Sequence, residues 1–303
     1  MSYAPIALFV YNRPRHTRRA VEALLANKDA AQSQLYVFSD AARDATALQA
    51  VAEVRTYIRS IKGFKAVTIV ERETNFGLAR SIIDGVTRLC EEYGCVIVLE
   101  DDLVTSPHFL AYMNDALARY ENEDRVMQIA GYMFPVNLDL EEDALFLPFT
   151  SSWGWATWKR AWRSFDAQGT GFQQLADDKN LRRTFDLNGK YAYFKMLESQ
   201  RRGKTNSWAI RWYLSVFLMN GLTVYPKKTL VRNLGFDGSG VNCVASSIEE
   251  SAIDQGFCAT SFPQLISVSD RYKLILEGLP KPKLNIGTMF NKGWHLFKSH
   301  LYK

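Results

Sequence analysis

Short apolar segments alternate with longer amphipathic segments over the first 130 residues of the chain. The apolar segments predict strands, several of them buried on both faces, at residues 5–11, 35–40, 66–70, 95–99 and 126–130. Apolar residues at three- and four-residue steps predict helices over about residues 16–27, 46–61, 79–93 and 107–120. This strand–helix order with short links predicts an α/β fold: a mostly parallel, doubly wound sheet with helices on both faces.

Three consecutive acids, Glu100, Asp101 and Asp102, follow the fourth predicted strand. Ionised carboxylates are costly to bury without a partner, and the carboxyl edge of an open α/β sheet is where such folds bind ligands. Mg²⁺ takes oxygen ligands and usually combines one or two carboxylates with substrate phosphates. The stretch therefore predicts a metal–diphosphate site. The alternative is an acidic N-terminus of the helix expected after Ser106 and Pro107.

Polar groups follow two other strands of the predicted sheet, Arg13 after the first and Asp40 after the second. Their coincidence with the acids at one sheet edge favours a nucleotide site there. The chain has no GxGxxG pattern after its first strand and no GxxxxGK[ST] pattern. This excludes the usual phosphate-binding loops of dinucleotide dehydrogenases and P-loop kinases.

Composition limits the classes of protein. The 303 residues fit one large or two ordinary domains, and a hydrophobic fraction of 47% supports a sizeable core. The net charge of +5 comes without a basic run, which argues against nucleic-acid binding. The four cysteines lack CxxC spacing, and we see neither a signal peptide nor an apolar run long enough to span a membrane. We therefore expect a cytoplasmic protein.

Aromatic residues gather in the second half of the chain. Trp153, Trp155 and Trp158 lie within eight residues, and Trp162 follows at helical spacing. These rings predict either an aromatic core or a wall for a sugar ring, because aromatic faces suit the apolar face of a pyranose. A second cluster at residues 207–212 opens a helix that we expect to end near residue 220.

Two short strands, at residues 222–225 and 229–231, then predict a small mixed sheet. A glycine-rich loop follows at residues 235–241, whose backbone can approach a ligand closely. The alternative is an ordinary surface loop.

Taken together, several motifs resemble a bacterial group of GT-A nucleotide-sugar transferases. More distantly, the chain is similar to N-acetylglucosaminyltransferase I, which carries the same Glu-Asp-Asp form of the Asp-x-Asp motif. The resemblance covers about residues 4–245 and rests on residues 75–78, 98–103, 106–107, 153–156, 225–227 and 233–236. It implies a GT-A fold with a nucleotide-sugar-binding half at 1–130, an acceptor-binding and catalytic α+β half at 131–245, and a C-terminal tail at 246–303.

The resemblance also implies roles for the residues that match its motifs. Asp102 would bind Mn²⁺ or Mg²⁺, and Asp101 and Glu100 would support the metal shell, the ribose or the donor sugar. Arg13 would contact the nucleotide, and Asp40 would hydrogen-bond the base.

The loop from Gly235 to Gly240 would close over the donor diphosphate. The remaining positions that we expect to contact a nucleotide-sugar donor, with a UDP-sugar as the first candidate, are Asn75, Arg80, Trp155 and Gly238.

One departure concerns the catalytic base. Many relatives carry an acid directly after the tryptophan that opens the second-half helix, where this chain has Ala209. Asp237, in the glycine-rich loop, is our first substitute because loop closure could bring it to the acceptor. Asp186 and Glu198 are further candidates. The alternative for each of the three is a solvated surface acid.

We therefore expect a metal-dependent, inverting glycosyltransferase of the hexosyl or N-acetylhexosaminyl type. Its acceptor would be a glycan or lipid-linked glycan of bacterial polysaccharide or lipopolysaccharide synthesis at the inner face of the membrane. Two alternatives stay open: a sugar-nucleotide nucleotidyltransferase and a non-catalytic glycan-binding relative. An apolar stripe flanked by lysines at residues 290–301 predicts either a helix that contacts the membrane or one docked on the core.

Overall fold

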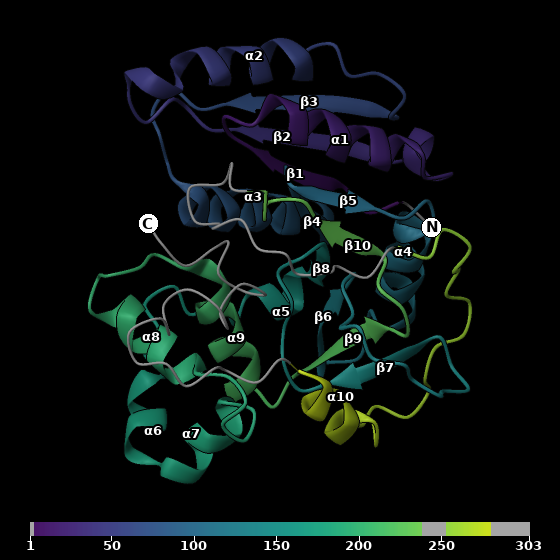
Figure 1. Ribbon diagram of the computed structural model, residues 1–303, viewed down its shortest axis with the longest axis vertical. Helices are drawn as coiled ribbons and strands as arrows, with labels where there is room; N and C mark the ends of the chain where they lie inside the picture. The colour runs from purple at the N-terminus through teal and green to yellow at the C-terminus, as the bar shows by residue number, and fades with distance from the viewer. Residues whose placement is uncertain (1–2, 238–252, 280–303) are drawn as a thin grey trace.

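The computed structural model describes residues 3–237 and 253–279 (Figure 1). Within them, the chain builds an eight-stranded sheet in the order β3-β2-β1-β4-β8-β6-β9-β7 and a two-stranded sheet of β5 and β10. The strands are β1 Ile6–Val10, β2 Gln34–Ser39, β3 Ala66–Glu71, β4 Cys95–Glu100, β5 Leu103–Thr105, β6 Val126–Ala130, β7 Ala144–Leu147, β8 Trp155–Trp158, β9 Leu222–Pro226 and β10 Val231–Asn233. The predicted α/β class with a large central sheet is confirmed.

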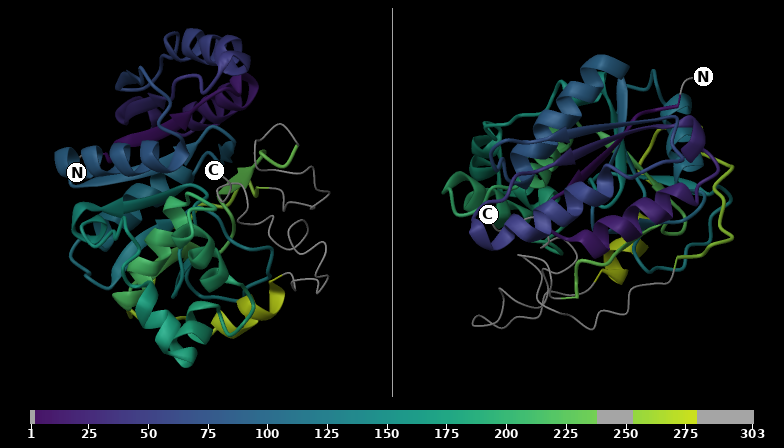
Figure 2. Two further views of the ribbon diagram at one scale, coloured as in Figure 1. Left: turned by 90° about the vertical axis from the view of Figure 1, so that its left-hand side faces the viewer. Right: turned by 90° about the horizontal axis from the view of Figure 1, so that it is seen from above.

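Helices cover both faces of this sheet (Figure 2). They are α1 Pro14–Leu25, α2 Leu48–Ile58, α3 Leu78–Tyr93, α4 Phe109–Arg119, α5 Lys159–Trp162, α6 Phe172–Asp177, α7 Lys179–Phe185, α8 Tyr193–Arg201, α9 Trp208–Leu218 and α10 Tyr272–Gly278, with short 3₁₀ turns at Ala30–Gln32 and Ala45–Ala47. Strand β1 shows the reason: Ile6 and Leu8 pack in one core with α1, α2 and α4, whereas Ala7 and Phe9 pack in another with α3 and α9. Alternate residues of a strand point to opposite faces, so a wholly apolar strand needs cover on both.

The first four long strands are parallel. β1 pairs with β2 and with β4, and β2 pairs with β3, so their carboxyl ends share one edge. The register sets Val10 beside Ser39, and Phe9 beside Glu100. The residues that follow these strands therefore begin at the same edge, as the sequence predicts.

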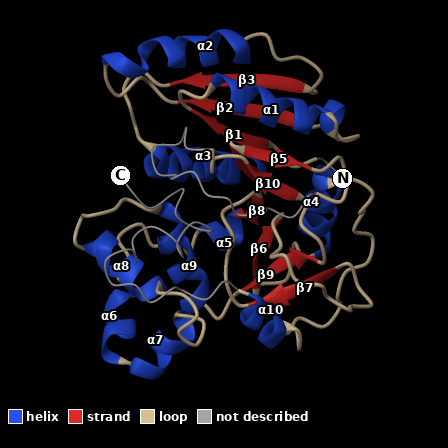
Figure 3. Ribbon diagram, in the orientation of Figure 1, coloured by secondary structure: helices blue, strands red, loops and turns tan. Residues whose placement is uncertain are grey.

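The other half of the sheet is mixed. β8 lies between β4 and β6 and is antiparallel to both, while β9 is parallel to β6 and β7 is antiparallel to β9. The prediction of a separate small sheet from the segments at 222–225 and 229–231 is wrong. Every residue of β9 is buried, which fits a strand inside the main sheet, whereas β10 pairs with β5 (Figure 3).

The described part of the predicted C-terminal tail, residues 253–279, packs on the body of the protein. The Phe262 ring stacks on the Tyr112 ring at a centroid distance of 5.8 Å, and the hydroxyl of Tyr120 donates to the Pro263 carbonyl at 2.7 Å. In α10, Ile275 and Leu276 are buried. The predicted stripe at 290–301 lies outside the described residues. Among the described helices, none combines the length and the apolar character needed to cross a membrane.

Candidate active site

The carboxylates of Asp101 and Asp102 lie buried in the turn between β4 and β5. Arg13, between β1 and α1, reaches both: its Nη2 donates to Asp101 Oδ1, and to Asp102 Oδ2 at 3.0 Å. Because β1 and β4 are parallel neighbours, the residues that follow them meet. The structure thus brings together three of the residues assigned from the sequence.

The charges in this cluster are not balanced. Burial raises the pKa of Asp101, and although the guanidinium of Arg13 lowers it and Asp102 raises it again, the net direction is upward. Burial lowers the pKa of Arg13, but the two carboxylates together raise it by more, so that the pKa lies above its ordinary value. Arg13 is thus a fixed cation facing two acids. Because one guanidinium carries a single positive charge, the cluster has excess negative charge when both acids are ionised.

Two oxygens of this cluster, Asp101 Oδ2 and Asp102 Oδ1, are buried and accept no hydrogen bond from the described part of the chain. A buried acceptor without a donor is costly, so such atoms call for a ligand. Mg²⁺ and similar hard cations bind one or two carboxylates together with substrate phosphates, and two adjacent carboxylate oxygens fit that need. No group of three or more histidine, cysteine or acidic residues suited to a metal occurs in the described ranges.

The segment after β10 crosses directly over these acids. The Leu234 amide donates to the Asp102 carbonyl at 2.8 Å, and the Gly235 amide donates to Asn233 Oδ1 at 2.7 Å. A β-carbon built on Gly235 would lie 2.4 Å from Asp102 Oδ2, so only glycine allows this approach. Asn233 is buried, and its Nδ2 has no hydrogen-bond partner among the described residues. The sequence motif around Gly235 thus forms one wall of the site, and sequence reasoning gave Asn233 no role.

Asp237 lies at the end of this segment, where its Oδ2 is 3.2 Å from His16 Nε2. The same ring nitrogen is 3.4 Å from the Leu234 carbonyl oxygen. Side-chain exposure is 51% for Asp237 but 10% for His16, so a largely buried imidazole holds a half-exposed carboxylate. His16 was not assigned from the sequence, although its place one turn after Arg13 could have suggested it. The expected donor contact Gly238 lies outside the described residues.

Asp40 has a different surrounding from the one expected. Its carboxylate accepts from the backbone amides of Ala41, Phe76 and Gly77 at 2.8–2.9 Å, and from Asn75 Nδ2 at 3.2 Å. A carboxylate offers about four acceptor positions, and these donors take all of them. In this arrangement Asp40 and Asn75 hold the loop between β3 and α3, and a nucleotide base would have to displace one of these bonds.

Trp155 and Arg80 occupy two different environments. Trp155 is 1% exposed, and its ring stacks on that of Trp208 with centroids 5.0 Å apart. This burial fits the aromatic-core interpretation of the tryptophan segment rather than a wall for the donor sugar. Arg80 is exposed in the first turn of α3, and its guanidinium carbon lies 3.8 Å from the centre of the Phe76 ring.

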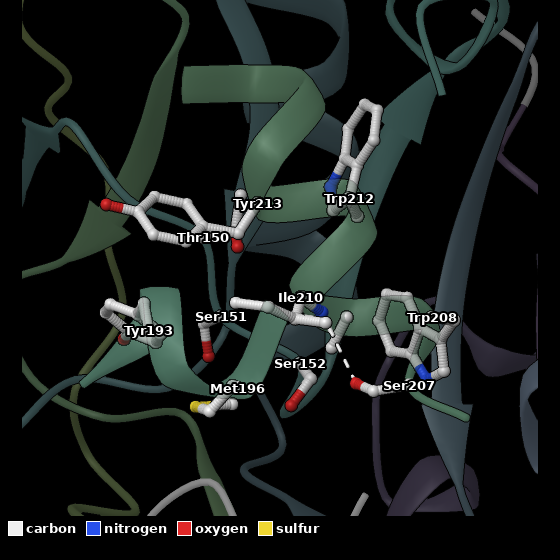
Figure 4. A pocket seen from close by; sticks show the side chains of 11 residues that line it. Thr150, Ser151, Ser152, Tyr193, Met196, Ser207, Trp208, Ile210, Trp212 and Tyr213 are labelled. Atoms are coloured by element: carbon white, nitrogen blue, oxygen red, sulfur yellow. Dashed lines mark hydrogen bonds between the residues drawn. The ribbon is translucent and has the colours of Figure 1, made fainter. Parts of the chain in front are cut away.

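A pocket opens beside the first turn of α9, around the position of Ala209 (Figure 4). It is lined by Thr150, Ser151, Ser152, Tyr193, Met196, Ser207, Trp208, Ala209, Ile210, Trp212 and Tyr213. None of these residues is an acid, and burial raises the pKa of the phenols of Tyr193 and Tyr213. The pocket itself therefore supplies no carboxylate in place of the acid absent at 209.

The two other candidate bases lie in the helical layer of α7 and α8 (Figure 1). Asp186 accepts from the Phe194 amide at 2.7 Å, and burial raises the pKa of its carboxyl. Glu198 forms an ion pair with Arg202 at 3.5 Å, four residues along α8. Neither has a recorded contact with the acids of the β4–β5 turn.

Comparisons with known proteins add a family to this geometry. Residues 6–172, more than half of the chain, match the family model described as Glycosyl transferase family 2. No curated protein matches the chain. Among solved structures it is similar to S. aureus TarS, with 12% identity, a TM-score of 0.41 and coverage of 77% of this chain and 37% of TarS. It is also similar to the Pyrobaculum calidifontis mannosyltransferase PcManGT in complex with GDP-Man and Mn²⁺, with 16% identity, a TM-score of 0.31 and coverage of 42% and 35%.

Proposed function

We propose that this chain, which belongs to glycosyl transferase family 2, moves a sugar from a nucleoside-diphosphate donor to a hydroxyl group of a glycan or lipid-linked glycan. The observation that carries the proposal is the pair of buried acids, Asp101 and Asp102, held by Arg13 at the carboxyl edge of the sheet. Two of their oxygens have no donor among residues 3–237 and 253–279.

In this proposal Asp102 and Asp101 hold a divalent cation, Mn²⁺ or Mg²⁺, through those two oxygens. When bound, the ion would neutralise part of the negative charge of the departing nucleoside diphosphate. Arg13 keeps the two carboxylates in place and offsets part of their mutual repulsion. Gly235 lets the backbone after β10 lie close to the diphosphate side of Asp102, where a larger residue would collide with the acid.

We further propose direct displacement with inversion at the anomeric carbon. The acceptor oxygen forms a bond to that carbon, the bond to the phosphate oxygen breaks, and the acceptor proton passes to a base. Asp237 is the proposed base, because its half-exposed carboxylate contacts the buried imidazole of His16, and that imidazole lies near enough to Asp101 to lower the pKa of its carboxyl. Because the carboxylate of Asp237 is half exposed, it is accessible to the hydroxyl group of an acceptor.

One observation favours a second candidate, a relative that binds glycans without transferring them. The residues that line the pocket around Ala209 include no acid. The position that carries the catalytic base in many similar enzymes therefore has no carboxylate here, and neither do its neighbours in the pocket. Such a protein would keep donor binding at Asp101 and Asp102 and would lack turnover.

The pathway and location belong to the proposal as well. We propose that the acceptor is an intermediate of bacterial polysaccharide or lipopolysaccharide synthesis at the inner face of the membrane. The support is the sequence resemblance.

Binding and turnover together test the proposal. Calorimetry of the full chain with UDP and with GDP, each with Mn²⁺ or with a chelator, should show metal-dependent binding that Asp102→Asn abolishes. Asp270→Asn, at an acid whose side chain is 81% exposed, is the matched control and should bind as the wild type. Release of nucleoside diphosphate from a panel of donor sugars then identifies a transferase. Metal-dependent binding without release with any donor and acceptor would favour the binding-only relative, and metal-independent binding would overturn the proposed metal site.

A further inference from the structure

A shallow groove lies between α3 and the start of α9, two helices whose buried side chains share one core on one face of the sheet. Seven side chains line it: Arg80, Ile83, Asp84, Thr87, Arg88, Asn206 and Arg211. Arg80, Asp84 and Arg88 follow each other at four-residue steps, so α3 turns one charged stripe toward the groove. Three of the seven residues are arginines, which makes the groove electropositive.

Arg211 is the least expected member of this set, because it is 8% exposed and its bonds go to neutral oxygens. Its guanidinium donates to the carbonyls of Ser207 and Ala167 at 2.9 and 2.8 Å, and to Asn206 Oδ1 at 3.0 Å. Within the described ranges, no carboxylate lies within ion-pair distance of it. Asp166 acts on it through its field, but that carboxylate accepts from amides in its own loop. Arg211 is thus a buried cation whose hydrogen bonds go to neutral oxygens, so the groove that it lines favours an anion.

The neutral groups of the groove also present donors. The hydroxyl oxygen of Thr87 accepts from Trp162 Nε1 at 2.9 Å, which leaves its own hydrogen to donate. The Asn206 oxygen is taken by Arg211, which leaves its amide hydrogens to donate. Asp84, the one acid in the lining, is ion-paired with Arg72. The groove thus offers cations and hydrogen-bond donors, with its single carboxylate already neutralised.

The groove adjoins the loop held by Asp40 at one end and the first turn of α9 at the other. At one end, Arg80 stacks on Phe76, whose amide is held by Asp40 at the edge of the sheet. At the other, Arg211 shares the first turn of α9 with Ala209, which lines the pocket described above. In the proposed function the acceptor lies near position 209, so a group bound in the groove would lie close to the acceptor.

We propose that this groove binds a phosphate group carried by the acceptor, held by Arg88 and Arg211 with Thr87 and Asn206 as further donors. Guanidinium groups suit phosphate because their paired N–H groups match its oxygens. The identification of the bound molecule as the acceptor rests on the proposed transferase function. The anion site itself rests only on the groove.

The test compares an alkyl glycoside 6-phosphate with the same glycoside without phosphate, by calorimetry on the full chain without any donor. We expect the phosphate to improve the dissociation constant by about tenfold or more, the usual effect of a charge-assisted hydrogen bond. Arg88→Gln, at an exposed side chain whose loss leaves the core intact, should remove this difference. Arg119→Gln, at an exposed arginine on α4 outside the groove, is the matched control and should keep it.

Equal affinity for the two glycosides, or a phosphate effect that survives Arg88→Gln, would overturn the anion site. Binding to phosphatidylglycerol vesicles that depends on Arg88, without any effect of phosphate on glycoside binding, would replace the acceptor with a lipid headgroup and overturn the proposal. Because the measurement needs no turnover, a failure of the proposed transferase function would appear separately, as absent nucleotide release.

Discussion

Gly235 and Asp102 lie in direct contact across the candidate active site. A β-carbon on Gly235 would be 2.4 Å from Asp102 Oδ2, closer than non-bonded atoms can approach. Asp102 cannot simply move away, because it is 2% exposed and bonded to Arg13. The position of the segment after β10 and the position of the acid are thus coupled.

We expect Gly235→Ala to weaken metal-dependent binding of a nucleoside diphosphate by tenfold or more, as about 1.4 kcal/mol of lost binding energy would do. The methyl group forces either the acid or the backbone out of place. Calorimetry with Mn²⁺ measures the effect. Gly256→Ala is the control, because a β-carbon there would meet its nearest neighbour, Asp254 Oδ1, at 3.6 Å. Equal binding by both variants would show that the contact is not important for the site.

Arg13→Gln should destabilise the protein by about 3–5 kcal/mol, because it leaves two buried carboxylates without their cation. We expect Mn²⁺ to raise the melting temperature of this variant more than that of the wild type, since the ion replaces part of the lost positive charge. Arg59→Gln breaks an exposed pair with Glu71 and should change stability by about 1 kcal/mol or less. Thermal and urea unfolding measure both. An Arg13→Gln protein as stable as the control would contradict the role given to Arg13.

Asp237→Asn should lower turnover by about 10²–10⁴-fold with little change in donor affinity, as the loss of a positioned base does. Steady-state release of nucleoside diphosphate measures it. Asp186→Asn and Glu198→Gln are the comparison variants and should keep most of the activity. If either of those loses turnover while Asp237→Asn retains it, the base lies on the α7–α8 side. A raised donor KM with unchanged turnover would instead make Asp237 a donor-binding residue.

Trp155→Ala should lower the free energy of unfolding by about 3–5 kcal/mol, since it opens a cavity beside Trp208 in the core. Trp155→Phe should cost less and leave folded protein for binding measurements. In that variant we expect the donor dissociation constant to equal that of the wild type. A clear loss of donor affinity in a stable Trp155→Phe protein would restore the interpretation of Trp155 as a wall for the sugar.

Asp143→Asn should loosen the segment at residues 259–262 from β7. Burial raises the pKa of Asp143, but the amides and hydroxyls of Thr260 and Ser261 lower it more, and the net direction is downward. A lowered pKa gives stability above the unfolded-state value of about 3.9, and this stability is lost as the pH falls through the folded-state value. We therefore expect a loss of about 1–3 kcal/mol at pH 7 that shrinks below about pH 4. Urea unfolding at pH 7 and pH 3 checks this, and an effect that stays constant with pH would contradict it.

The parallel half of the fold was predictable because its signals are local. Each buried strand is an apolar run, and Gly94 ends α3 in the left-handed conformation that glycine favours. The meeting of Arg13 with Asp101 and Asp102 followed from parallel topology alone. β8 could not be found in this way, because it is only four residues long and Thr157 interrupts its apolar run.

The candidate site was predictable where its residues adjoin strands and less so where distant segments meet. His16 and Asp237 are far apart in the sequence, and their contact depends on the path of the chain after β10. The hydrogen bonds to Asp40 come from the loop between β3 and α3. No sequence pattern indicates that the backbone amides of this loop would donate to the carboxylate oxygens of Asp40. The groove arginines belong to two helices whose packing brings them together.

β8 also decides how the molecule can move. Its hydrogen bonds to β4 on one side and to β6 on the other join the parallel strands β1 to β4 and the mixed strands β6, β7 and β9 into one continuous sheet. Two lobes that share an unbroken ladder cannot open and close about a hinge between them without breaking it. We therefore expect any movement that admits a ligand to lie in the loops at the sheet edge, above a sheet that stays continuous from β3 to β7.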